Sequence, residues 1–95
     1  MTAYDARPWL KHYSDWVPPD LPLARVSAID QFRATVREHG DRPAVYYFDT
    51  VLTYRDLDRL SNALAAGLSR LGVEKGSRVA LYLQNVPQFW VAQLA

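Results

Sequence analysis

A helix with a clear start signal and a clear stop signal is the feature that most constrains this chain. Thr53 is followed three residues later by Asp56, a pairing in which the threonine hydroxyl covers a free backbone N–H at the helix N-terminus. Gly72 stands where a left-handed residue closes a helix, and Val73 can fold back onto the last turn. The sequence therefore predicts one continuous helix over 54–71.

Leucine recurs along this helix at steps of three and four residues, the spacing of one helix face. The leucines of this stripe are Leu57, Leu60, Leu64, Leu68 and Leu71. Leu52, just before the cap, is placed to pack on Leu57 as a hydrophobic staple. If the stripe is the buried face, Leu64→Ala at its middle will destabilise the fold far more than Ser61→Ala beside it.

Apolar runs on both sides of the helix predict strands. Residues 51–53 precede it, and residues 79–83 follow a polar turn without alternation, as expected of a strand covered on both faces. This order predicts a β-α-β unit with parallel strands and a right-handed connection. Residues 44–48 and 51–53, split by Asp49-Thr50, predict a β-hairpin. The expected fold class is α/β, a β-hairpin plus a β-α-β unit.

The first 26 residues differ from the rest because prolines alternate there with aromatic residues. Proline fixes φ and removes a backbone donor, so we expect an extended arm with at most a helical turn near Leu10. Two interpretations are open: the arm packs on the folded body, which we favour, or it is an exposed contact site for a partner or a membrane surface. The predicted organisation is an arm over 1–26 and a truncated first α/β layer over 27–95.

Two further helices are expected in this layer. Ser27 repeats the capping pattern ahead of a helix that ends at His39, and Asn85 is placed to cap a last helix with Pro87 in its first turn. The large apolar residues of that last helix are Phe89, Trp90, Val91 and Leu94. We interpret Ala95 as a cut inside this helix, and we expect the isolated chain to self-associate through its truncated apolar face.

Composition excludes several classes of function. Among 95 residues, 11 Lys+Arg stand against 10 Asp+Glu without blocks of like charge, so a nucleic-acid surface is not expected. The absence of cysteine excludes disulfides, thiolate metal sites and a cysteine nucleophile. No signal peptide and no membrane-spanning run is visible, so we expect a cytoplasmic protein, with peripheral membrane association as the alternative.

No catalytic, cofactor-binding or metal site is predicted in the chain. His12 and His39 lack a metal-ligand spacing, and a helix-dipole partner is the simpler role for His39. The glycines form no phosphate-cradling loop. Asp56 and Asp58 are expected to be a cap and a solvated charge. Asn85 follows a predicted parallel strand, where α/β sheets place ligands, but a helix cap explains it more simply.

Several short strings, taken together, point to a known family. They are LTYRDLD at 52–58, LSN at 60–62, LGV at 71–73, KGSRVA at 75–80, NVPQF at 85–89 and DRPA at 41–44. Over nearly its whole length the chain resembles the opening of the adenylate-forming (AMP-binding) synthetases. The arm sequence RPWLKHY at 7–13, with Val17-Pro18, is similar to the bacterial long-chain fatty acid–CoA ligase branch.

The resemblance implies an activity for the full-length enzyme. It would couple ATP to a fatty acid as an acyl-adenylate, release pyrophosphate and pass the acyl group to coenzyme A, with Mg²⁺ neutralising the phosphates. The family's phosphate loop, nucleotide-binding motifs and catalytic lysine have no counterpart here, so the chain alone is expected to be an inactive scaffold that binds no cofactor. The alternatives are an aryl- or aminoacyl-adenylating domain, or a free-standing interaction module.

Overall fold

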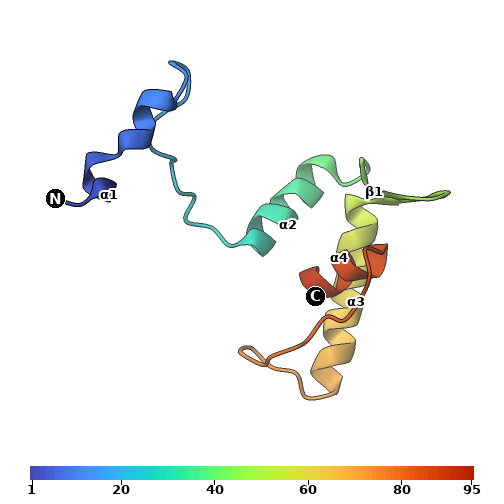
Figure 1. Cartoon of the computed structure of the whole chain (residues 1–95). Helices are drawn as coiled ribbons and strands as arrows, with labels where there is room; N and C mark the ends of the chain where they lie inside the picture. The colour runs from blue at the N-terminus through green and yellow to red at the C-terminus, as the bar shows by residue number, and fades with distance from the viewer.

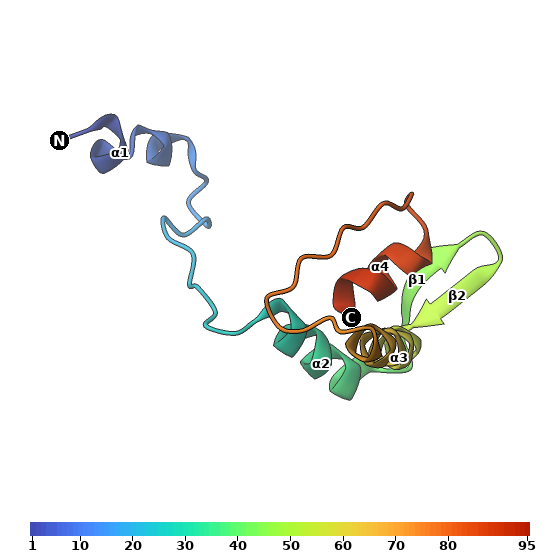
Figure 2. The same cartoon turned by 90° about the horizontal axis from the view of Figure 1, so that it is seen from below.

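The computed structural model describes residues 1–95 as an N-terminal arm and a body of helices with one hairpin (Figures 1 and 2). The arm contains α1 (Ala3–Ala6) and the 3-10 helix η1 (Pro8–His12), which includes the turn predicted near Leu10. The body contains α2 (Ala28–His39), β1 (Pro43–Tyr47), β2 (Thr50–Thr53), α3 (Tyr54–Arg70) and α4 (Pro87–Leu94). The molecule measures 52 × 32 × 27 Å, and in both views the arm stands away from the body.

Helix α3 begins on the predicted capping box. The Thr53 N–H donates to Asp56 Oδ2 over 3.0 Å, and the Asp56 N–H donates to Thr53 Oγ1 over 3.1 Å. The side chain of each residue thus accepts a hydrogen bond from the backbone N–H of the other. Backbone N–H groups at the start of a helix have no acceptor within the helix, so these side chains take that place. The start of α3 at Tyr54 is confirmed.

The end of α3 is also confirmed, to within one residue. Gly72 takes φ +92°, the left-handed conformation that glycine adopts without strain. The Val73 N–H donates to Leu68 O over 3.1 Å, and the Gly72 N–H donates to Ser69 O over 3.0 Å. These two bonds form a Schellman motif around the cap residue Leu71.

The predicted hairpin is confirmed with its turn shifted by one residue. Strands β1 and β2 pair antiparallel with Tyr47 opposite Thr50, so the turn is Phe48-Asp49 and not Asp49-Thr50. Phe48 takes φ +49°, a left-handed conformation that costs a non-glycine residue about 1–2 kcal/mol. Two-residue turns with positive φ match the right-handed twist of the flanking strands, which explains why the pairing places Phe48 there.

The prediction of a second, parallel strand after α3 is wrong. Residues 79–83 form no strand, and the only sheet is the antiparallel β1–β2 pair, so the α/β class holds without a parallel connection. A strand is held by hydrogen bonds to a neighbour, and β1 and β2 pair only with each other. Much of the segment runs on the far side of α4 from the hairpin (Figure 2), so no strand is beside it.

The small core lies where α3 meets its neighbours, and it takes in only part of the predicted leucine face. Leu57 of α3 and Val36 of α2 are the buried apolar side chains, at 5% and 8% exposed. Ser61 is 3% exposed whereas Leu64 is 36% exposed, because α2 and α4 contact the side of α3 that carries Ser61 and Ala65. The predicted ranking of Leu64→Ala above Ser61→Ala therefore loses its basis, because Ser61 is buried and Leu64 is not.

Helix α2 begins as predicted and is fastened to α3 at its end. Ser27 Oγ accepts a hydrogen bond from the Asp30 N–H over 3.1 Å. Beyond the helix, the buried Gly40 accepts at its carbonyl from the Arg55 N–H over 2.9 Å. A Cβ added to Gly40 would lie 2.6 Å from Arg55 Nη2 and 2.6 Å from Val36 O, so this close approach requires glycine.

Helix α4 does not begin on Asn85, which corrects the predicted cap. Its N-cap is Val86, with φ −119° and ψ 159°, and no side chain caps the helix. Proline disfavours the α conformation in the residue before it and is well suited to the first helical position. Pro87 therefore fixes the start of α4 at itself and leaves Asn85 outside the helix.

The arm is not packed on the body, so the interpretation favoured from the sequence is wrong. Its polar contacts are internal: Arg7 forms an ion pair with Asp20 at 2.9 Å and also donates to the backbone of the same segment. The rings of Tyr4 and Trp9 meet edge to face with centroids 5.4 Å apart. Trp16 is 83% exposed. The other interpretation, an exposed contact site, stays a prediction.

Candidate functional site

The two histidines lie far apart in the fold. His12 is on η1 in the arm, and His39 is at the end of α2, where its Nε2 lies 3.7 Å from the carboxylate of Glu38. No group of three or more His, Asp or Glu side chains comes close enough to hold a metal ion. His39 thus meets a single carboxylate at the end of α2, and neither histidine joins a cluster that could hold a metal ion.

Asp56 is a capping carboxylate, as predicted. The backbone N–H of Thr53 donates to it, the Thr53 hydroxyl donates to it over 2.9 Å, and together they lower the pKa of Asp56 from 3.8, with a smaller contribution from Arg59. Asp58 is half-buried beside Ser61, whose hydroxyl donates to the Asp58 carbonyl over 3.1 Å. An ionised cap of this kind stabilises the helix start and has no proton to give at neutral pH.

Asn85 is exposed at the edge of a groove between β1 and the start of α4. The groove also contains Tyr47, Pro87 and Phe89, and Asn85 is the only amide or charged residue that lines it. A carboxamide can orient a ligand by hydrogen bonds, but it does not act as an acid or a base at neutral pH. The structure thus does not gather a reaction centre around Asn85.

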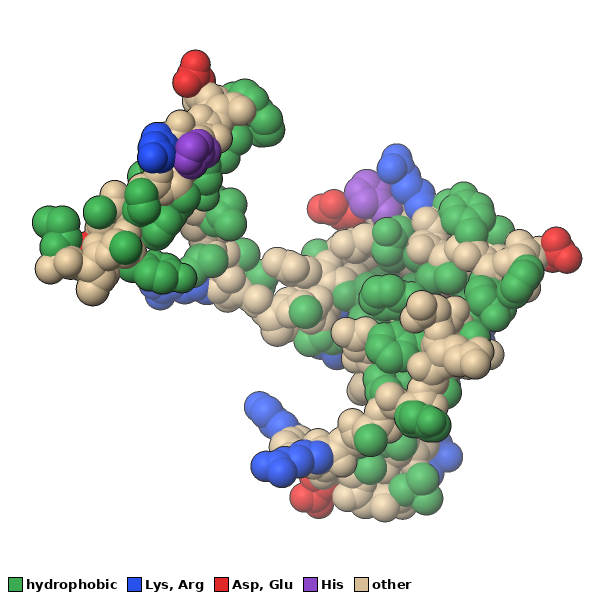
Figure 3. Space-filling model, viewed as in Figure 1, with side chains coloured by type: hydrophobic (Ala, Val, Ile, Leu, Met, Phe, Trp, Pro, Cys, Tyr) green, Lys and Arg blue, Asp and Glu red, His purple; other side chains and the backbone are tan.

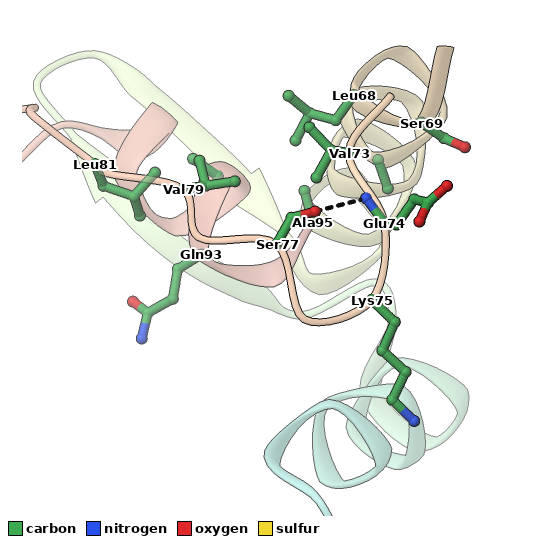
Figure 4. Close-up of a pocket in the computed structure, with 12 residues that line it drawn as sticks. Leu68, Ser69, Val73, Glu74, Lys75, Ser77, Val79, Leu81, Gln93 and Ala95 are labelled. Atoms are coloured by element: carbon green, nitrogen blue, oxygen red, sulfur yellow. Dashed lines mark hydrogen bonds between the residues drawn. The ribbon is translucent and has the colours of Figure 1, made fainter. Parts of the chain in front are cut away.

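A hollow of about 530 Å³ opens between the end of α3, the loop that follows it and the end of α4 (Figure 4). Leu68 and Val79 are among its apolar lining residues, and Lys75 points away from it in the close-up. The Glu74 N–H donates to Ser77 Oγ over 3.0 Å, which fixes the turn at the rim. Seven of the twelve residues that line the hollow are hydrophobic, and a mostly apolar wall of this kind suits packing.

Hydrophobic side chains are also widely exposed over the hairpin and α4 (Figure 3). A groove lined only by apolar residues runs here between α2, β1, α3 and α4, and Phe32, Tyr46, Trp90 and Leu94 contribute to it. We call this surface the apolar groove. Exposed apolar surfaces of this kind are typical of sites that bind protein, membrane or another part of the same polypeptide.

Sequence reasoning missed two features that shape this surface. The first is the close contact between Arg55 and Gly40, here called the clamp, for which the only sequence signal was a glycine after a helix. The second is the burial of Ser61, which the sequence did not indicate. The exposure of Trp90, at 52%, did have a signal, because α4 is apolar on most of its faces and one small domain cannot cover them all.

Comparisons with known proteins identify the family of this chain, which the geometry does not. A family model described as AMP-binding enzyme matches residues 32–95. The long-chain-fatty-acid–CoA ligase of Escherichia coli O6:H1 is 40% identical over 86 residues, covering 88% of this chain and 15% of that protein. The enzyme of the same name from Bacillus subtilis (strain 168) is 33% identical over 82 residues, covering 86% and 15%.

A 4-coumarate–CoA ligase of Humulus lupulus is 38% identical over 84 residues, covering 84% of this chain and 14% of that protein. No solved structure matches the chain significantly. The chain spans about 15% of the length of the curated fatty-acid relatives it matches. The share of this chain that they cover exceeds the body, 27–95, so these relatives also match part of the arm.

Proposed function

This chain belongs to the AMP-binding enzyme family, and on that premise we propose that it is the N-terminal part of an ATP-dependent CoA ligase for long-chain fatty acids. The observation that carries the proposal is the 40% identity to a long-chain-fatty-acid–CoA ligase over the body and part of the arm. The name of that relative, long-chain-fatty-acid–CoA ligase, states the acid and the acceptor.

The complete enzyme would join a fatty acid carboxylate to ATP as an acyl-adenylate and release pyrophosphate. The thiol of coenzyme A would then displace AMP and form the thioester. The residues described here fit neither Mg²⁺ nor a triphosphate, because no acidic cluster is present and the glycines serve a clamp, a helix and two turns. This chain contributes scaffold, and by itself it is inactive.

The test is to extend the open reading frame beyond Ala95, express the complete protein and assay thioester formation with ATP, Mg²⁺, coenzyme A and palmitate. Thioester with palmitate supports the proposal, and a matched assay with 4-coumarate tests the second candidate, an aryl-acid ligase, which the Humulus lupulus relative favours. A stop codon directly after Ala95 would contradict both and favour a free-standing interaction module.

The 95-residue chain alone serves as the control. We expect no ATP–pyrophosphate exchange from it with any carboxylic acid, since phosphoryl and adenylyl transfer need positioned donors around the phosphates. Exchange above background in a contaminant-free sample would show that the chain carries a site of its own.

The isolated chain is proposed to self-associate. The apolar groove is open and Trp90 is half-exposed, so a second copy can cover surface that this chain leaves in water. Light scattering should report dimers or larger species at high concentration. A clean monomer, with the fluorescence of a solvated Trp90 ring in a Trp9→Phe, Trp16→Phe background, would contradict this.

The arm is proposed as a contact surface, because it stands free of the body and exposes Trp16, Leu21 and Leu23 (Figure 1). No helix of the structure is long and apolar enough to cross a membrane. Peripheral binding can be measured by co-sedimentation with phosphatidylcholine vesicles, with and without anionic lipid. We expect Trp16→Ala to weaken binding and Tyr82→Ala, which alters a fully exposed aromatic residue of the body, to leave it unchanged.

A further inference from the structure

The tip of the hairpin carries a large apolar side chain in a strained conformation. Phe48 takes φ +49°, and of the two turn residues it alone has a positive φ. This is the φ pattern of a type II′ turn, whose first central position usually holds glycine. Phenylalanine is poorly suited to that position, whereas glycine would form the same turn without strain.

Contacts within this chain do not offset the strain. Phe48 is 90% exposed, and its one ring-to-ring contact is an edge-to-face pair with Tyr47, with centroids 4.7 Å apart. The turn end of the hairpin projects away from the helices in both views (Figures 1 and 2). Backbone strain persists where other interactions over-determine it, so the strain at Phe48 points to a contact that lies outside this chain.

The strands next to the tip carry large apolar side chains on both faces. Val45 and Leu52 oppose each other and are half-buried, whereas Tyr46 and Val51 oppose each other on the other face and are exposed. A hairpin with one solvated face typically alternates apolar and polar residues, so apolar residues on both faces indicate that both faces are covered. We call Tyr46, Phe48 and Val51 together the hairpin surface.

The course of the chain and the length of its relatives favour the later part of the same polypeptide as the cover. Tyr46 and Leu94, the last residue of α4, line the same apolar groove, so a polypeptide that continues beyond Ala95 leaves the body beside the hairpin surface. The family model matches 32–95, which includes the hairpin. The match covers only 15% of the fatty-acid relatives, so most of such an enzyme lies outside this chain.

We propose that the hairpin surface is a docking surface for the part of the enzyme that follows Ala95, with the Phe48 ring held in an apolar pocket of that part. The proposal rests on the proposed function, in which this chain is the N-terminal part of a longer ligase. Burial of the ring in the complete enzyme offsets the strain of the turn. Asp49 places a carboxylate beside the ring, which suits the polar rim of a protein pocket and disfavours insertion into a membrane.

Hydroxyl-radical footprinting with mass spectrometry tests the burial, because aromatic side chains are oxidised at a rate that follows their exposure to solvent. Phe48 and Tyr46 should be oxidised several-fold more slowly in the complete protein than in the 95-residue chain, diluted until light scattering reports monomers. Equal oxidation of Phe48 in the two proteins overturns the proposal. Protection by the same polypeptide persists on dilution, so protection that is lost on dilution means that a second copy covers the ring, and this result also overturns the proposal.

Phe48→Gly adds a test by sign, because it removes the strain and the ring together. In the 95-residue chain it should raise the denaturant midpoint, since glycine suits the turn and little burial is lost. In the complete protein it should lower the melting temperature, since the buried ring is replaced by a cavity. Asp49→Ser, which alters the tip and keeps the ring, is the matched control and should shift both values less. Shifts of the same sign in the two proteins, or no loss in the complete protein, overturn the proposal.

The thioester assay on the same preparation keeps this proposal apart from the proposed function. A complete protein that joins palmitate to coenzyme A while Phe48 stays exposed overturns the docking surface and leaves the ligase standing. A complete protein that protects Phe48 but forms no thioester overturns the ligase and supports the docking surface.

Discussion

Two helix starts in this chain use the same residues and the same bonds, yet they produce different structures. In the arm, the Thr2 N–H donates to Asp5 Oδ2 over 2.6 Å and the Asp5 N–H donates to Thr2 Oγ1 over 3.3 Å. In the body, Thr53 and Asp56 make the same pair of bonds. The first box begins the four-residue α1 and the second begins the 17-residue α3.

The difference lies beyond the cap. Helix α1 buries no residue and ends at Arg7, which takes φ +46° ahead of Pro8. Helix α3 buries Leu57 and Ser61 and contacts α2, α4 and both strands. Capping chemistry thus decides where a helix begins, whereas burial and the next stop signal decide whether it continues.

The largest expected effect on stability comes from truncating a buried side chain of α3. Leu57→Ala should cost about 2–5 kcal/mol of unfolding free energy, because truncation of this buried side chain loses transfer energy and leaves a cavity in the core. Leu10→Ala in the arm is the matched control and should leave the denaturant midpoint of the body unchanged. Equal shifts would show that the arm and the body unfold as one unit.

The clamp between α2 and α3 gives the next effect. Gly40→Ala should cost about 1–3 kcal/mol, since the new Cβ would lie 2.6 Å from the backbone oxygen of Val36, which cannot swing away as the Arg55 side chain can. The φ of Gly40 is −50°, so the cost is steric and not conformational.

Gly67→Ala is the opposite case and serves as the control for the clamp. Nothing lies within 4 Å of its added Cβ, and it sits inside α3, so alanine should raise the unfolding free energy by about 0.5–1 kcal/mol. Thermal unfolding of both variants tests the contrast in sign. Two changes of the same sign would mean that Arg55 and Val36 relax around an alanine at Gly40.

The caps themselves give a smaller effect. Thr53→Ala should lower the unfolding free energy by about 1 kcal/mol, because it removes the bond to the Asp56 N–H. Thr2→Ala removes the equivalent bond in the arm and should lower only local order there. Fluorescence denaturation in a Trp9→Phe, Trp16→Phe background, where Trp90 is the one tryptophan left, measures the body, and amide exchange measures the arm. A midpoint shift from Thr2→Ala would contradict the separation of arm and body.

The sequence predicted the features of this fold that depend on neighbours along the chain. The caps at Ser27 and Thr53, the Gly72 stop and the hairpin are confirmed because each is decided within a few residues. Contacts between residues far apart in the sequence decided the other features. Residues 79–83 have strand character but no strand beside them. Helix α3 buries Leu57 of the leucine stripe together with Ser61, whereas Leu64 and Leu71 of the same stripe are exposed.

The prediction that the chain carries no catalytic or binding residue rests on the absence of the family's motifs. The resemblance to the AMP-binding family could be seen from the sequence alone. The opening strings at 52–58 and 75–80 lie in the matched region. What the sequence could not indicate was the apolar groove, since it combines α2, β1, α3 and α4 in one surface. Its members share no spacing along the chain.

The smallest expected effect tests the two caps through their charge. Thr53 lowers the pKa of Asp56, and Thr2 lowers the pKa of Asp5, in both cases from 3.8 and chiefly through the backbone N–H. A carboxylate with a lowered folded-state pKa stabilises the folded state fully above its unfolded value, and this contribution is lost as the pH falls through the folded pKa. For Asp56 the loss should therefore begin below about pH 4 and appear as a falling midpoint of body unfolding. Asp56→Asn should flatten that part of the profile and Asp5→Asn should not, although NMR titration should find both pKa values lowered. A body midpoint that responds to Asp5→Asn as strongly as to Asp56→Asn would mean that the arm's helix start is coupled to the core after all.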